Sequence, residues 1–176
     1  MLSFFGVVRM LLLFEKAKQT RRLAMKLLND PKFKQEILER LRTVRPDSPR
    51  RWGKMNARQM VCHLSDSFLG AMGERSTQIA PGYPARKLIK WVALYVPLPW
   101  PKGVSTRPEF DQEICGTPPA DFSEDLRGLQ MLINRYTEQP RKFQFQSHPI
   151  FLEMSERDWM RWGYLHMDHH LRQFGV

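Results

Sequence analysis

Apolar side chains recur at spacings of three or four residues in four separate segments of this 176-residue chain. That spacing gathers them on one face of an α-helix, whereas a half-buried strand would alternate apolar and polar residues. No segment sustains such an alternation. Four one-sided helices can remove their apolar faces from water by packing against one another. The sequence therefore predicts an all-α fold, an up-down four-helix bundle, with helices at 31–44, 56–72, 121–138 and 155–174.

Residues that favour helix ends support these boundaries. Asp30 precedes Pro31, Asn56 precedes the second helix, and Ser155 stands three residues before Asp158, which is the spacing of a capping box. A short extra helix is predicted at 86–96 and ended by the prolines that follow. From there to about residue 120 no helical period is found. The second and third bundle helices are thus expected to be joined by a long irregular connection, of a kind that often borders a functional site.

The first 24 residues form an apolar stretch followed by a basic one, and we expect them to be an extension outside a single domain at 25–176. Such an extension either comes from an upstream start, with Met25 as the natural beginning, or lies as a helix on a membrane surface. A secretory signal matches poorly because Arg9 interrupts the apolar run. With two cysteines and no apolar run long enough to span a bilayer, the chain is expected in the reducing cytoplasm.

The net charge of +10 is unevenly distributed. Residues 1–58 contain 15 Lys and Arg against 5 Asp and Glu, while residues 59–176 contain 13 of each. The larger part of the chain is therefore neutral, and the basic excess belongs to its beginning. Because nucleic-acid binding would rest on this charge alone, it is not expected.

Histidines on the last predicted helix indicate a metal site. His166 and His170 are four residues apart, so their imidazoles stand one helical turn above each other and can share one ion. Trp159, Trp162 and Gln173 lie on the same face. Two histidines make half a site, and the candidate for the third ligand is His63, on the second predicted helix. The alternative is that all three are core histidines with ordinary hydrogen bonds.

A helix-borne histidine followed by a C-terminal H-x-x-x-H-x-x-Q resembles the DinB/YfiT-like superfamily of bacterial four-helix bundles. Further phrases resemble a subgroup of unknown function: Trp52-Gly-Lys-Met55, Pro99-Trp-Pro-Lys-Gly103 and His148-Pro149. The resemblance covers about residues 31–175. It implies a three-histidine site for a divalent metal, zinc or nickel, in a metal-dependent transferase or hydrolase. The metal would activate a low-molecular-weight thiol or a water against a small electrophilic substrate.

Several readings stay open beside this one. The chain is either such an enzyme or a non-catalytic bundle that binds a metal or small ligand, and it is expected to be a monomer or homodimer. Asp66, one turn after His63, either orients an imidazole or is an exposed helix charge. His148 either lines the pocket or makes a turn contact, and Trp159 and Trp162 either wall the pocket or belong to the core.

Overall fold

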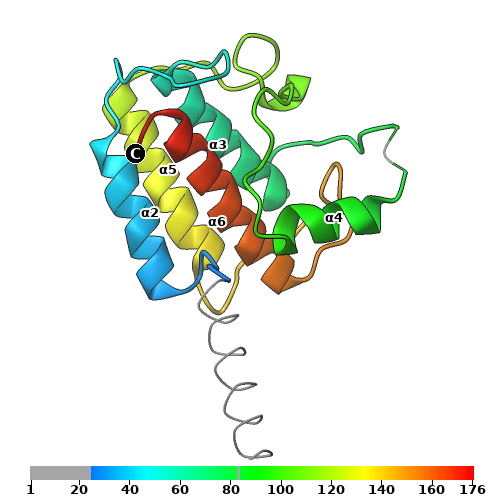
Figure 1. The fold of residues 1–176 in the computed structure, drawn as a ribbon. Helices are drawn as coiled ribbons and strands as arrows, with labels where there is room; N and C mark the ends of the chain where they lie inside the picture. The colour runs from blue at the N-terminus through cyan, green and yellow to red at the C-terminus, as the bar shows by residue number, and fades with distance from the viewer. Residues whose placement is uncertain (1–24, 83) are drawn as a thin grey trace, which may run out of the picture.

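The computed structural model describes residues 25–82 and 84–176, which form five α-helices, one short 3-10 helix and no strand. The prediction of an all-α fold is therefore confirmed for this part of the chain. The predicted extension at 1–24, with its membrane-surface alternative, lies outside the described residues. None of the described helices is both long enough and apolar enough to span a bilayer. The helices are α2 (Pro31–Thr43), α3 (Ala57–Ala71), α4 (Arg86–Tyr95), η1 (Pro108–Phe110), α5 (Phe122–Thr137) and α6 (Glu156–Gln173) (Figure 1).

Local side-chain hydrogen bonds explain where the helices begin. Asp30 directly precedes Pro31, the first residue of α2, and its carboxylate accepts from the backbone N–H of Lys32. Capping boxes open α3, between Asn56 and Gln59, and α6, between Ser155 and Asp158. Each such cap satisfies helix N–H groups that have no partner within the helix, which typically stabilises a helix by about 1 kcal/mol. The predicted helix ends differ from the observed ones by at most one residue.

The helices pack around one apolar core. The α3 helix packs on α5 and also meets α6, while α2 packs on the other side of α6 (Figure 1). Tyr136 of α5 joins these elements through two buried contacts. Its ring packs on Phe68 of α3 with ring centroids 4.7 Å apart, and its hydroxyl donates to the backbone carbonyl of Trp159 on α6 at 2.8 Å. The α4 helix lies outside this group and packs on α6.

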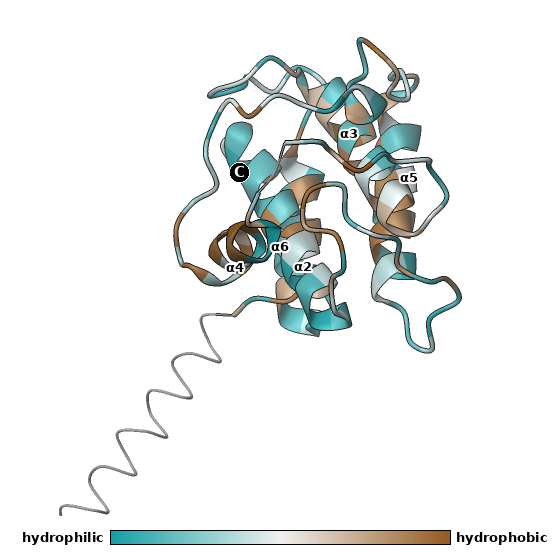
Figure 2. Cartoon of the chain, turned by 90° about the vertical axis from the view of Figure 1, so that its right-hand side faces the viewer, coloured by the Kyte–Doolittle hydropathy of each residue, from teal (hydrophilic) through white to brown (hydrophobic). Residues whose placement is uncertain are grey.

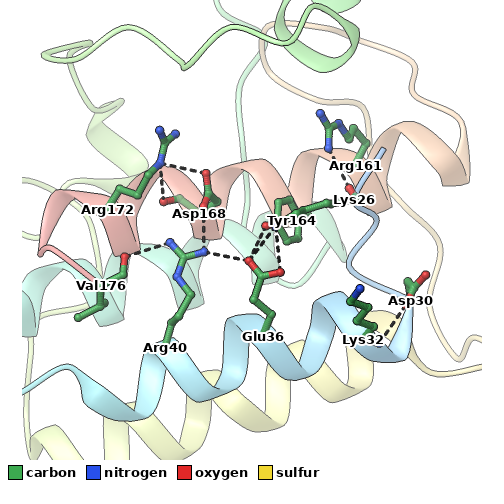
Figure 3. A network of polar contacts seen from close by, with 10 residues as sticks. All are labelled: Lys26, Asp30, Lys32, Glu36, Arg40, Arg161, Tyr164, Asp168, Arg172 and Val176. Atoms are coloured by element: carbon green, nitrogen blue, oxygen red, sulfur yellow. Dashed lines mark hydrogen bonds and ion pairs between the residues drawn. The ribbon is translucent and has the colours of Figure 1, made fainter. Parts of the chain in front are cut away.

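A polar seam holds α2 against α6 (Figure 3). Arg40 of α2 donates to Asp168 of α6 at 2.8 Å and to the carbonyl of the last residue, Val176, at 3.0 Å. One turn earlier, Glu36 accepts from the Tyr164 hydroxyl at 2.9 Å and from Lys26. These bonds fix the rotation of α6 about its axis, and so they decide which of its faces points towards α3.

Candidate metal centre

Three histidines from two helices converge inside the fold. One ring nitrogen each from His63 of α3 and from His166 and His170 of α6 lies within 4.8 Å of the other two. Their ring centroids are 4.7–5.2 Å apart. The closest pair of nitrogens is Nε2 of His63 and Nε2 of His166, at 3.2 Å. The three residues predicted to be ligands are thus brought together, and among the described residues no fourth His, Cys, Asp or Glu joins them.

Two of the rings are held by hydrogen bonds on the nitrogen that faces away from the cluster. Nδ1 of His63 lies 2.9 Å from the carbonyl oxygen of Phe110, and Nδ1 of His170 lies 2.9 Å from Oε1 of Gln173. Because both oxygens can only accept, both Nδ1 atoms must carry the proton. The lone pair of each neutral ring is then on Nε2. This is the arrangement that metal-ligating histidines usually have.

The Gln173 amide can face His170 in only one orientation. Its Nε2 donates to the backbone carbonyl of Trp52 at 2.9 Å, and that carbonyl cannot donate in return. The loop before α3 comes very near at this point: a Cβ added to Gly53 would lie 2.5 Å from Nε2 of Gln173. Gly53 also has a φ of +79°, which disfavours other residues. Gln173, which was predicted to share the histidine face of α6, therefore connects the loop at Trp52 to the His170 ring through its two hydrogen bonds.

His166 is the histidine without a fixed outer partner. Its Nδ1 is buried and makes no hydrogen bond to any described residue. Its Nε2 faces Nε2 of His63. In the tautomer that the Phe110 carbonyl fixes, this His63 nitrogen carries a lone pair and no proton. The ring lies between the indoles of Trp162, with centroids 4.8 Å apart, and Trp100, at 6.1 Å. His63 and His170 are buried, whereas His166 is only partly buried.

The electrostatics of the cluster favour neutral imidazoles. Burial lowers the pKa of His63, and the hydrogen bond to Phe110 and the nearby Asp66 charge offset this only in part. Burial, followed by the neighbouring histidines, holds the pKa of His166 well below its usual range. The same two causes act on His170 and outweigh the hydrogen bond to Gln173 that raises its pKa. Neutral rings are the form that can bind a metal ion.

The geometry of the cluster fits a divalent ion. Two imidazole nitrogens on one tetrahedral ion, each about 2.0–2.1 Å from it, are about 3.3 Å apart. The 3.2 Å between the Nε2 atoms of His63 and His166 matches that separation. Without an ion, one hydrogen bond can join this pair, but the Nε2 lone pair of His170 gains no donor from it. A cation between the three rings would instead bind a lone pair of each.

Asp66 is fully buried, so its alternative interpretation as an exposed charge is wrong. The structure does not place its carboxylate on an imidazole either. It accepts from Nη1 of Arg75 at 2.9 Å, from the Thr117 hydroxyl at 2.7 Å and N–H at 2.8 Å, and from Gln112 at 3.1 Å. All but Arg75 belong to the irregular connection. Asp66 therefore fastens to α3 the same loop that supplies the Phe110 carbonyl to His63.

The other predicted site residues lie beside the cluster. His148 is buried in a turn, where its Nδ1 accepts from the N–H groups of Ile150 and Phe151, both at 3.1 Å. Its ring also packs 5.7 Å from that of Trp162. Trp159 is buried in the core, 5.4 Å from Trp162 between ring centroids, and of these two only Trp162 has a ring contact with a cluster histidine.

Sequence reasoning missed the contribution of the loops. Trp52 and Trp100 belong to phrases noted in the sequence, and both rings pack about the neighbouring His169 with centroids 6.0 Å away. His169 itself does not join the cluster. The Phe110 contact uses a backbone oxygen, which leaves no mark in the residue types. The one signal in the sequence was the long irregular connection after residue 96, which predicted that this part of the chain borders a functional site.

Comparison with known proteins adds no relative. No family model, no curated protein and no solved structure matches this chain. The case for a metal centre is therefore carried by its own geometry: three convergent histidines, two of them with fixed tautomers, and no fourth ligand among the described residues.

Proposed function

We propose that the protein is a metal-dependent enzyme built on an up-down four-helix bundle of the DinB/YfiT-like type. His63, His166 and His170 would hold one divalent ion, zinc or nickel. The reaction would be a transfer or hydrolysis in which a thiol or a water attacks a small electrophilic substrate. The order of the ligands supports this proposal, with one histidine on α3 and an H-x-x-x-H-x-x-Q on α6.

The observation that carries the proposal is the fixed direction of two lone pairs. Phe110 and Gln173 hold the protonated Nδ1 atoms of His63 and His170, so that both Nε2 atoms are free to bind an ion. A core histidine with ordinary hydrogen bonds would instead use both ring nitrogens. Here the buried Nδ1 of His166 also lacks a partner among the described residues. Three neutral rings with unused nitrogens in one place suit a ligand set better than a packing cluster.

The residues around the cluster would control what reaches it. Three protein ligands leave a position open, as in catalytic rather than structural zinc sites. When bound, a divalent ion supplies Lewis acidity that lowers the pKa of a water or thiol ligand and polarises an electrophile. The indoles of Trp100 and Trp162 flank His166 and would exclude bulk water from that side. The free cysteines, buried Cys62 and exposed Cys115, fit the reducing cytoplasm as the place of action.

Elemental analysis of protein purified without a histidine tag tests the proposal. We expect about one zinc or nickel per chain, and loss of that metal in the His63→Ala variant. Cobalt exchanged into the site should give visible absorption bands that change when a small thiol is added, because a thiolate enters the open position. Protein that binds no metal under either condition would overturn the proposal. A tightly bound metal whose cobalt spectrum ignores thiols, anions and pH would favour the non-catalytic alternative.

A further inference from the structure

The α4 helix carries an apolar face that no described part of the chain covers. Leu88, Trp91 and Val92 are 60%, 56% and 43% exposed, and their spacing of three and four residues places them on one side of the helix. Leu98, just beyond the helix, is 66% exposed. The opposite side of α4 buries Leu94 against the fold. Figure 2 shows α4 as a strongly apolar helix at the edge of the molecule.

The apolar face lies within a purely basic stretch of sequence. Residues 75–108 contain six Lys or Arg and no Asp or Glu. The same stretch holds six of the eight large apolar side chains that are exposed among the described residues. Lys87, beside Leu88, and Lys102 are both exposed. Three of these six cations have carboxylate partners, Arg75 with Asp66, Lys90 with Asp158 and Arg107 with Glu109, and Lys102 lies over the Trp52 ring. Lys87 is therefore the exposed positive charge on α4 itself, next to its apolar face.

The first described residues are tied to α4 through a side chain of α6. Arg161 of α6 donates from Nε to the Leu94 carbonyl on α4 at 2.9 Å and from Nη1 to the Lys26 carbonyl at 3.1 Å. One side chain therefore ties the first described residues to α4, and Figure 3 shows its bond to Lys26. The sequence that precedes Met25 is itself apolar over residues 1–14 and basic over 15–24.

We infer that the exposed face of α4 binds the surface of an anionic lipid membrane. Apolar side chains with a tryptophan would enter the boundary between headgroups and acyl chains, while Lys87 and Lys102 would meet anionic headgroups. A second copy of the chain is a poorer occupant, because a two-fold contact through this face would set its basic residues against their own copies. This inference is independent of the metal centre.

Vesicle sedimentation with the full chain tests the inference. We expect binding to vesicles that contain about one-third phosphatidylserine, weakening with added salt, and little binding to pure phosphatidylcholine. The double variant Leu88→Glu/Trp91→Glu should partition at least about tenfold more weakly, since it puts two charges on the apolar face. The matched control is Ile114→Glu/Met131→Glu, which changes two equally exposed apolar residues outside the basic stretch and should bind like the wild type.

A second measurement reports insertion directly. Brominated lipids should quench tryptophan fluorescence in the wild type, and Trp91→Phe should remove most of that quenching. Unchanged circular dichroism and metal content would show that the variants fold. Three results would each overturn the inference: no vesicle binding by the wild type, binding that the α4 variant retains, or equal binding to neutral vesicles. A dimer that the α4 variant dissociates, without vesicle binding, would assign the face to a second copy instead.

Discussion

Replacing Asp66 by Asn keeps the shape of a fully buried side chain and removes its charge. The carboxylate accepts four hydrogen bonds, two on each oxygen, from Arg75, Thr117 and Gln112. An asparagine offers one acceptor oxygen, and its NH2 group would face donors in place of the other. Two bonds are therefore lost and Arg75 loses its counter-ion. Since the Arg75 side chain remains 21% exposed and water can reach it, we expect a loss of about 3 kcal/mol in the free energy of unfolding.

The same change should weaken metal binding from a distance. Arg75 also donates to the carbonyls of Glu109 and Cys115, on either side of the segment that presents the Phe110 oxygen to His63. Once Asp66 no longer holds Arg75 and Thr117, this loop is less well fixed, and the Nδ1 proton of His63 loses part of its restraint. Because changes in the partners of ligating residues typically cost 10–100-fold in affinity, an indirect effect should lie near the lower end, about tenfold.

Both effects can be measured on one preparation. Urea denaturation of the metal-free protein gives the stability change, and competition with a chromophoric chelator gives the metal affinity. Glu124→Gln is the control, because its ion pair with Arg127 is more than 60% exposed and should contribute almost nothing. A large loss of stability with unchanged metal affinity would refute the positioning of His63 through the loop. Unchanged stability would refute the buried network itself.

Three further predictions concern the site and its surroundings. His170→Ala should weaken metal binding about a hundredfold or more because a ligand is lost, while His169→Ala should do so only mildly; calorimetric titration measures both. His148 has its pKa lowered by burial to about 3, so below pH 6.5 the unfolded chain takes up a proton that the folded protein excludes, and stability falls as pH drops, by about 4 kcal/mol near pH 3. His148→Asn retains an acceptor for the turn and should flatten this decline in urea titrations. Deleting 1–24 should leave a folded, metal-binding domain, by circular dichroism and metal analysis, because the described residues, whose buried core begins at Leu28, already hold the capped helices and the three histidines.

Each of these has an outcome that would count against it. If His169 is required for the metal and His170 is not, the assignment of faces on α6 is wrong. If wild type and His148→Asn lose stability in parallel between pH 6.5 and 4, protonation of His148 does not limit folding at low pH. If the shortened chain unfolds, residues 1–24 belong to the core rather than to an extension.

The helices could be predicted because their signals are local. Asp30, Asn56 and Ser155 cap the helices that follow them through bonds spanning two or three residues, and apolar stripes repeat within one helix. The pairing of helices was expected only in general form. Which face of α6 meets α3 depends on bonds such as that between Arg40 and Asp168, which are 128 residues apart in sequence.

In the candidate metal centre, too, the local features could be predicted and the long-range contacts could not. His166, His170 and Gln173 share one helix, so their common face follows from spacing alone. Asp66 has the right spacing to reach His63, yet its carboxylate turns to the connecting loop, because Arg75 and Thr117 satisfy a buried charge better than one imidazole N–H does. Helical spacing shows which side chains are neighbours, but it does not show which other partner competes for them.

The hydrogen bonds that orient the ligands are made largely by backbone atoms, and this limits any reading from residue types. The carbonyl of Phe110 sets the tautomer of His63, and the carbonyl of Trp52 sets the orientation of the Gln173 amide that holds His170. A carbonyl is present at every position, so neither role requires Phe or Trp as such. The sequence does show one requirement of this contact. Position 53 is a glycine, and a side chain there would collide with Gln173. In this site the residue types identify the three candidate ligands, while the course of the loops decides which lone pairs those histidines offer.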